Sequence, residues 1–249
     1  MSLFNRRRGL GCLEDSPDER DRQLGELLAS SAHVPRSASV AHPLVQARDQ
    51  RATSSCVGFA FSQAIRLAYL ARGVDCPELS PLFAYYLSRA AHGVKAVDAG
   101  TYLRTCAHAI RQLGIASNEA WPFDTWKVNT APTMRAHHSA HDRRGVRGYY
   151  RIPSGDTNGI RRAIAAGVPV VFGITVDEDF LDPRGPLLVE RMNGRFVGGH
   201  AMVVESFHDG GTFTLLNSWG RGYRNDGRVD VTEDVMRMAT DVWALEIEP

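Results

Sequence analysis

Lysine is nearly absent from this chain of 249 residues, which contains only Lys95 and Lys127. Arginine supplies the other basic side chains, and the formal net charge is +1. Because so balanced a charge produces no strong overall field, we expect neither nucleic acid nor an acidic membrane surface as a partner. Long apolar runs are also missing, since no stretch reaches the roughly 18 to 20 apolar residues of a membrane-spanning helix.

The N-terminus lacks the apolar core of a cleavable signal peptide. Three arginines at positions 6–8 are followed by only a few uncharged residues before an acidic cluster begins at Glu14. We therefore expect a cytoplasmic protein, or one exported without a cleavable signal peptide, such as a secreted effector. Residues 1–34 are polar and turn-rich, with one short helix near residues 24–29, and we interpret them as an N-terminal extension.

Cysteine is scarce as well. The four cysteines, Cys12, Cys56, Cys76 and Cys106, are irregularly spaced and lack the paired CxxC spacing of a structural zinc site. We expect no disulfide framework, no metal and no cofactor. Cys76 and Cys106 are interpreted as small buried apolar side chains.

Helix signals dominate the first half of the chain. Residues 54–72 are dense in apolar side chains and Gly73 follows them, which predicts a largely buried helix with Cys56 at its N-terminus. Ser80 and Pro81 form a second helix start. Further helices are predicted over residues 101–113 and, in the second half, 157–166.

Strand signals dominate the second half. Residues 168–176 form a buried run rich in β-branched side chains, and the turn Asn193-Gly194 predicts a hairpin that joins residues 187–190 to residues 195–197. The remaining predicted strands cover 201–207 and 212–216, which flank a turn at 209–211, and lie near 229 and over 242–247.

One cysteine and one histidine have surroundings that fit nucleophilic chemistry. A reactive cysteine needs its thiolate, and a free thiol with a pKa near 8.5 is mostly protonated at neutral pH. The helix N-terminus predicted at Cys56 lowers that pKa, and a nearby imidazolium would lower it further. Among nine histidines, His200 follows Gly198 and Gly199, which leave its approach uncrowded, and precedes a predicted strand.

Three segments together resemble the papain family of cysteine peptidases. Residues 49–60 place Gln50 six positions before Cys56, as in the nucleophile segment of that family. The run Gly198-Gly199-His200-Ala201 resembles the family's histidine strand, and Asn217-Ser218-Trp219-Gly220 resembles its asparagine motif. The histidine follows the cysteine by 144 residues and the asparagine follows it by 161, where roughly 130 to 150 are expected.

The resemblance extends from about residue 35 to the C-terminus and implies an α+β, papain-like fold of two lobes. We expect a papain-like domain over residues 35–249, with a helical lobe at about 47–125 and a β-barrel-like lobe at about 126–249. The active-site cleft would lie between the lobes. The polar, histidine-containing stretch from Phe123 to Tyr149 is interpreted as the crossing between them.

The resemblance also implies a role for each motif residue. Cys56 would attack the scissile carbonyl, His200 would transfer the proton, and Asn217 would hold the histidine in place. The Gln50 side-chain amide and the Cys56 backbone N–H would stabilise the oxyanion. The expected substrate-binding residues are Gly199, Trp219, which would also cover the histidine–asparagine hydrogen bond, and Ala99 and Gly100, which stand where the family has a glycine pair.

Two departures from the family pattern lie beside the nucleophile. Val57 stands where the family usually has tryptophan, which removes packing but no chemical group. Thr53 replaces a disulfide-forming cysteine, and the missing bridge fits a reducing compartment.

The N-terminal extension is similar to a stretch in bacterial members of this family in which a short leader covers the cleft. The similarity lies in residues 11–21. We predict that residues 1–34 pack against the enzyme and inhibit it intramolecularly, since an extended segment can occupy a peptide-binding groove.

Three functions remain open at this point. The first is an endopeptidase that acts on a peptide or protein substrate through a thioester acyl-enzyme. The second is a related thiol amidase, aminopeptidase or acyltransferase, which a blocked end of the cleft would favour. The third is a catalytically silent papain-like binding module, which the simultaneous presence of Gln50, Cys56, His200 and Asn217 disfavours.

Overall fold

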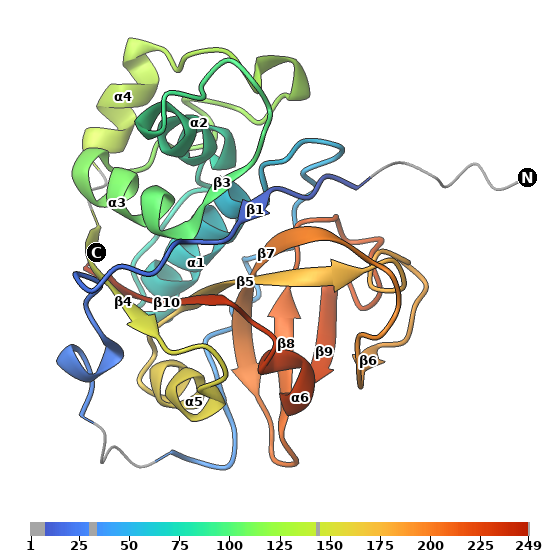
Figure 1. Cartoon of the computed structure of the whole chain (residues 1–249). Helices are drawn as coiled ribbons and strands as arrows, with labels where there is room; N and C mark the ends of the chain where they lie inside the picture. The colour runs from blue at the N-terminus through green and yellow to red at the C-terminus, as the bar shows by residue number, and fades with distance from the viewer. Residues whose placement is uncertain (1–7, 30–33, 143–144, 249) are drawn as a thin grey trace, which may run out of the picture.

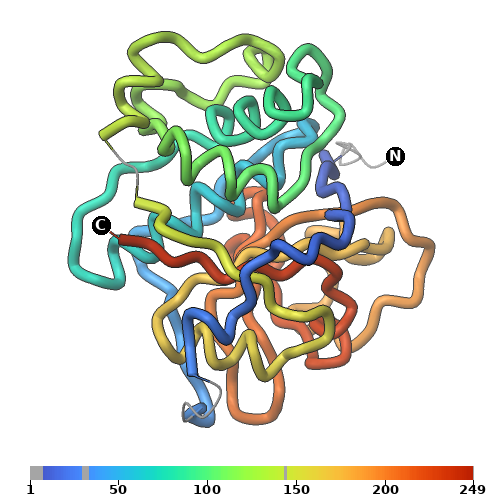
Figure 2. Tube along the Cα trace, turned by 60° about the vertical axis from the view of Figure 1, so that its left-hand side comes forward, coloured from blue at the N-terminus to red at the C-terminus, as the bar shows by residue number. Residues whose placement is uncertain are grey.

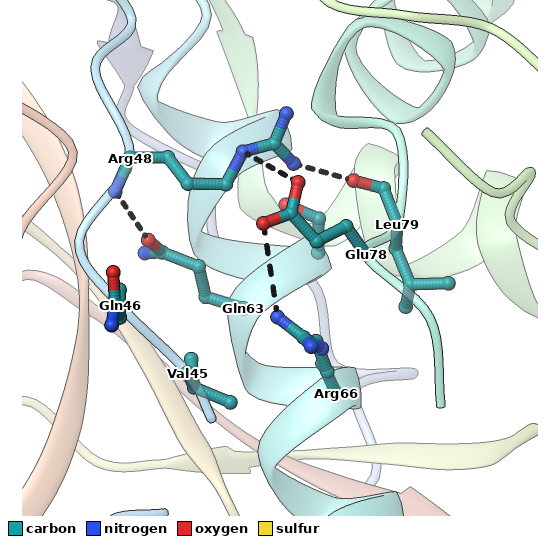
Figure 3. A pocket seen from close by; sticks show the side chains of 8 residues that line it. Val45, Gln46, Arg48, Gln63, Arg66, Glu78 and Leu79 are labelled. Atoms are coloured by element: carbon teal, nitrogen blue, oxygen red, sulfur yellow. Dashed lines mark hydrogen bonds and ion pairs between the residues drawn. The ribbon is translucent and has the colours of Figure 1, made fainter. Parts of the chain in front are cut away.

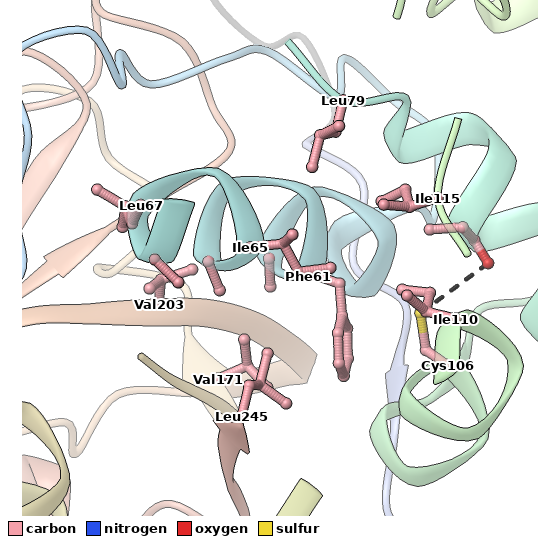
Figure 4. Packing of buried hydrophobic residues seen from close by; sticks show 14 of the residues in the cluster. Phe61, Ile65, Leu67, Leu79, Cys106, Ile110, Ile115, Val171, Val203 and Leu245 are labelled. Carbon is pink, nitrogen blue, oxygen red and sulfur yellow. Dashed lines mark hydrogen bonds between the residues drawn. The ribbon is translucent and has the colours of Figure 1, made fainter. Parts of the chain in front are cut away.

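A long buried helix joins the two halves of the molecule. In the computed structural model, which describes residues 8–29, 34–142 and 145–248, helix α1 (Cys56–Ala71) runs between a helical half and a β-rich half (Figure 1). Its side chains are apolar on nearly every face, so it can be covered on both sides. Figure 4 shows Phe61 of this helix pointing toward the strands that carry Val171 and Leu245, and Ile65 belongs to the same buried cluster.

Two further helices of the helical half lie where the sequence predicts them. Helix α2 (Pro81–Ala91) begins where the Ser80 side chain accepts a hydrogen bond from Phe83 N, and helix α3 (Leu103–Leu113) ends at Gly114, which has a φ of 78°. The 3-10 turn η2 (Thr125–Lys127) follows. Both predicted helices are therefore present, although residues 101 and 102 form the short strand β3 (Thr101–Tyr102) instead of the first turn of α3.

The crossing between the halves lies later in the chain than the sequence predicts. Helix α4 (Met134–His141) occupies much of the stretch that was interpreted as the crossing, and its Ala136 and Ala140 are buried together with Phe83 of α2. The helical lobe therefore continues to about residue 142, beyond the boundary expected at about residue 125 but within the stretch from Phe123 to Tyr149. The first strand of the second half, β4 (Val146–Ile152), begins directly afterwards.

The β-rich half is one twisted sheet, with strand order β4-β10-β5-β7-β8-β9-β6. A further short strand, β2, pairs with the end of β7. Strands β4 and β6 end the path and do not pair with each other within the described residues, so the sheet stays open and is barrel-like only in its curvature. Helices α5 (Thr157–Ala165) and α6 (Glu233–Met236) lie beside the sheet (Figure 1). The strand bounds are β2 (Ala38–Ser39), β5 (Val170–Asp177), β6 (Leu188–Val189), β7 (Phe196–Phe207), β8 (Thr212–Leu216), β9 (Arg228–Thr232) and β10 (Asp241–Ile247).

The hairpin predicted at Asn193-Gly194 does not form. Leu188 pairs in parallel with Asp230 of β9, whereas Phe196 pairs with Asp177 of β5. The Asp177 carboxylate accepts a hydrogen bond from Gly194 N at 3.0 Å, which ties the predicted turn to β5. The second predicted hairpin, β7 to β8, is confirmed.

The N-terminal extension crosses the junction between the two halves. Its strand β1 (Cys12–Leu13) pairs in parallel with β3, and the predicted helix near residues 24–29 is the 3-10 turn η1 (Leu24–Glu26). Figures 1 and 2 both place this blue segment across the helical and β-rich halves. No helix in the described ranges is both long and apolar enough to cross a membrane.

Candidate active site

Cys56 lies at the N-terminus of α1, as the sequence predicts, and its side chain is fully buried. The first turn of α1 lies close to β7, and the backbone N–H groups of Ala201 and Gly11 lie near enough to the thiol to act on its pKa, which they lower. Ala201 directly follows His200. The fold therefore brings the cysteine and the histidine strand together, although 144 residues separate them in the sequence.

His200 is held on one side by Asn217. Its Nε2 lies 2.8 Å from Asn217 Oδ1, which also accepts a hydrogen bond from Ser218 N at 2.7 Å. Because Asn217 Oδ1 can only accept, His200 Nε2 carries the proton. His200 Nδ1 is buried and has no hydrogen-bond partner within the described part of the chain, so this nitrogen is left to accept a proton.

An aromatic cluster covers the histidine. The Trp219 ring stacks on the His200 ring with centroids 4.3 Å apart, and Tyr223 and Phe180 lie edge-on to the tryptophan. Trp219 is 3% exposed. This packing fixes the imidazole plane and excludes water from the hydrogen bond to Asn217, which agrees with the role predicted for Trp219.

The Gln50 side chain is fixed in orientation by hydrogen bonds at both of its polar atoms. Its Oε1 accepts a hydrogen bond from the Ser218 hydroxyl at 2.6 Å, and its Nε2 donates to the Thr53 carbonyl at 2.7 Å and to the Gly9 carbonyl at 3.0 Å. Ser218 was not singled out from the sequence, although it lies inside the asparagine motif. Its hydroxyl fixes which way the Gln50 amide points.

A stretch of the extension lies directly over Cys56. Gly9 N donates to the Arg51 carbonyl at 3.1 Å, Gly11 N donates to the Gly199 carbonyl at 3.1 Å, and Thr101 N donates to the Gly11 carbonyl at 2.9 Å. The segment is bound mainly through its backbone, as an added strand. Residues 8–13, which we call the leader strand, therefore fill the cleft.

The leader strand can approach so closely because it contains two glycines that the sequence reasoning did not single out. A Cβ at Gly9 would lie 1.8 Å from the Thr53 carbonyl oxygen, and a Cβ at Gly11 would lie 2.1 Å from that of Ser54. Both distances are far below van der Waals contact. Glycines at alternate positions, Gly9 and Gly11, are the sequence signal for this close approach.

Not all of the predicted substrate-binding residues contact the leader strand. The Gly199 carbonyl binds it, and Gly100, with a φ of 80°, approaches so closely that a Cβ would lie 2.5 Å from the Gly11 carbonyl oxygen. Ala99 is exposed, and the N–H group that pairs with the leader strand belongs to Thr101. Gly100 and Gly199 thus line the cleft, whereas Ala99 lies at its edge.

Burial under the leader strand neutralises the reactive pair. Desolvation raises the pKa of the Cys56 thiol to about 11, although three backbone N–H groups and its own oppose the shift. Desolvation also lowers the pKa of His200 to about 4, and the charge of Arg8 acts in the same direction. The sequence argument predicted a thiolate and an imidazolium, and this is wrong for the covered site because burial disfavours both charges.

A separate small pocket lies between α1 and the loop that precedes α2. Arg48, Arg66 and Glu78 line it, and ion pairs of 3.8 and 4.0 Å join both arginines to the glutamate (Figure 3). None of the predicted site residues borders this pocket. The described residues also contain no group of histidine, cysteine and acidic side chains that could hold a metal ion.

Comparisons with known proteins agree with the fold. No family model matches the sequence. An uncharacterized peptidase C1-like protein of Acanthamoeba polyphaga mimivirus is 29% identical over 218 residues, which cover 80% of this chain and 68% of that protein.

Two solved structures have the same architecture. Xylellain, a cysteine protease from Xylella fastidiosa, superimposes with a TM-score of 0.87 at 23% identity, over 100% of both chains. A digestive procathepsin L 3 of Tenebrio molitor gives a TM-score of 0.73 at 20% identity, over 96% of this chain and 75% of that one. The chain thus has the papain-like, two-lobe α+β fold of cysteine-type peptidases, and the resemblance drawn from its motifs is confirmed.

Proposed function

We propose that the chain is a cysteine peptidase that hydrolyses peptide bonds through Cys56, His200, Asn217 and Gln50. The observation that carries this proposal is the leader strand, whose Gly9 carbonyl accepts a hydrogen bond from Gln50 Nε2. An extended main chain therefore fits this cleft, and the Gln50 amide can donate a hydrogen bond to one of its carbonyl groups. A scissile carbonyl at that point would face both the nucleophile and the oxyanion donor.

The reaction follows from these positions. His200 Nδ1 takes the Cys56 proton as the sulfur attacks the carbonyl carbon, and Gln50 Nε2 and Cys56 N–H stabilise the oxyanion. When the C–N bond breaks, the imidazolium gives that proton to the leaving amine. A water molecule, deprotonated by the same imidazole, then hydrolyses the thioester and restores the thiol.

In the covered state we propose that the leader strand inhibits the enzyme intramolecularly. It occupies the Gln50 donor and the main-chain groups of Gly199 and Thr101, and it desolvates the thiol. A substrate needs these same groups. Residues 1–7 and 30–33 of the predicted inhibitory segment 1–34 lie outside the described residues.

The proposal is tested by labelling with a thiol-directed epoxide inhibitor of papain-like enzymes, followed by cleavage of a peptide library. We expect a single adduct on Cys56, no adduct in the Cys56→Ala variant, and cleavage of internal peptide bonds. Labelling with cleavage only at chain ends or of small amides would favour an aminopeptidase or another thiol amidase. Failure both to react and to cleave, in a Gly11→Ala variant whose added Cβ displaces the leader strand, would favour a silent binding module.

A carboxyl group of the extension should make leader docking depend on pH. The Asp15 carboxylate accepts hydrogen bonds from Arg104 N and Trp243 Nε1, but burial and the neighbouring Asp241 raise its pKa from 3.8 to about 6. Asp15 binds its proton more tightly in the docked form than in the undocked form, so protonation of Asp15 favours docking. This contribution of Asp15 to docking is fully present below pH 3.8 and is lost as the pH rises through about 6.

The Asp15→Asn variant removes this charge and should stay docked at neutral pH. Since one pKa unit corresponds to about 1.4 kcal/mol, we expect hydrogen exchange of the leader amides near pH 7.5 to slow by roughly tenfold or more relative to wild type. Near pH 4 the leader amides of the two proteins should exchange at the same rate. The matched control is Asp18→Asn, whose carboxylate pairs with Arg20 and with no other residue in the described part of the chain. Equal slowing in this control would contradict the assignment.

A further inference from the structure

A network of hydrogen bonds joins the turn before Cys56 to the loop that carries Gly100. The Asp98 carboxylate accepts hydrogen bonds from Ser54 N, at 3.0 and 3.1 Å to its two oxygens, and from the Tyr85 hydroxyl at 2.6 Å. The Tyr85 oxygen in turn accepts a hydrogen bond from Gly100 N at 2.9 Å. The chain of contacts runs from Ser54 through Asp98 and Tyr85 to Gly100.

The tyrosine at the centre of this network is held in place by packing. Tyr85 belongs to α2 and its side chain is fully buried. Helix α2 lies so close to α1 that a Cβ at Gly58 would lie 3.0 Å from the Tyr85 Cβ. The Arg89 guanidinium lies 4.1 Å from the ring centroid on one face. The hydroxyl therefore stands at a fixed point between the two segments.

The polarity of each bond is also fixed. Burial, and the hydrogen bond to Asp98, raise the pKa of Tyr85 well above its ordinary value, so the hydroxyl keeps its proton. It donates that proton to Asp98, and its lone pairs remain free to accept from Gly100 N. Because a carboxylate only accepts, Ser54 N and Tyr85 can bind it together without competing.

The network stands where the chain lacks a covalent link. Thr53 replaces a cysteine that forms a disulfide in the resembling family, and all four cysteines of this chain are free. The Thr53 hydroxyl bonds only within its own turn, to the Gln50 carbonyl and the Ser55 hydroxyl. The connection from this turn across to the loop at residues 98–100 is therefore made by Asp98.

We propose that Asp98 and Tyr85 are positioning residues, which hold the Gly100 loop against the turn before Cys56 so that peptide main chain binds in register with the thiol. This inference rests on the peptidase function proposed above. Neither residue touches the reacting atoms. Their loss should weaken peptide binding more than it slows the chemical step.

Tyr85→Phe removes one oxygen atom and leaves the packed ring in place. The Gly100 N–H then loses its acceptor, and we expect KM for an extended peptide to rise about tenfold while kcat changes less than twofold. The kinetics are measured in the full chain carrying Gly11→Ala, which displaces the leader strand. Tyr86→Phe, on the adjacent residue of α2 and outside the network, is the matched control.

A second measurement does not depend on turnover. In the full-length chain without Gly11→Ala, hydrogen exchange of the Gly100 amide should speed up at least tenfold in Tyr85→Phe and in Asp98→Ala, less in Asp98→Asn, and not in Tyr86→Phe. Unchanged exchange in Tyr85→Phe, or a fall in kcat with constant KM, would overturn the inference. If no variant cleaves peptide, the proposed function fails, and the exchange data alone decide whether the network positions Gly100.

Discussion

Replacing Gly11 by alanine is expected to raise peptidase activity of the full chain by about tenfold to a hundredfold. The added Cβ would lie 2.1 Å from the Ser54 carbonyl oxygen, which belongs to the backbone and cannot rotate away. Overpacking of this kind costs about 1 to 3 kcal/mol, and only the docked form of the leader bears that cost. Initial rates on a fluorogenic peptide, at equal protein concentration, measure the shift.

A second glycine of the extension provides the control. Gly25 lies in η1, and a Cβ there would meet no atom within 4 Å, so Gly25→Ala should leave the rate unchanged. Opening the cleft should also return water to the thiol, so the pKa of Cys56 should fall below the value of about 11 that it has when covered. Equal rates for wild type and Gly11→Ala, with both enzymes active, would refute inhibition by the leader strand.

In the Gly11→Ala background, His200→Gln should lower kcat by at least about a thousandfold. Glutamine is uncharged at every working pH and cannot accept the thiol proton or return it to the leaving amine. Losses of this size or larger accompany removal of the base from comparable nucleophile–base pairs. Single-turnover rates measured with excess enzyme would separate this chemical step from product release.

His208 provides a matched histidine for this experiment. It contacts Ser206 and Thr214 near the far end of β7 and β8, away from the cleft. His208→Gln should retain activity within a few-fold. If His200→Gln retained similar activity, the proton would have to travel through another group and the proposed mechanism would be wrong.

The sequence was sufficient to predict helix α1 and the position of Cys56 at its N-terminus. Apolar density over residues 54–72 predicted α1. The resemblance of the motif around Asn217 to the papain family implied that Asn217 is the partner of His200. The hydrogen bond between His200 and Asn217, at 2.8 Å, agrees with that expectation.

Elsewhere the deciding interactions are tertiary and left little trace in the sequence. Helix α4 buries only two small residues, Ala136 and Ala140, so its apolar face is too faint to separate from a loop. The turn at Asn193-Gly194 has hairpin chemistry, but Asp177 binds Gly194, and Leu188 finds a different partner in β9. These contacts with residues distant in the sequence outweigh the local turn preference of Asn193-Gly194.

The charge state of the reactive pair could not be predicted either. A helix N-terminus favours a thiolate, but the same position under the leader strand is fully buried, and desolvation dominates. Asp98 and Tyr85 were missed for a similar reason, because their importance depends on contacts between α2, the loop before β3 and the turn before α1.

The leader strand is held on the body of the protein through β1 on β3, and the chain that follows the extension pairs with the sheet through β2 on β7. An inhibitor that belongs to the same chain has an effective concentration set by geometry, typically in the millimolar range for a short tether. Dilution therefore cannot free the cleft. Under the inhibition proposed above, opening of the cleft is first order in protein, and a substrate has to compete with a tethered segment.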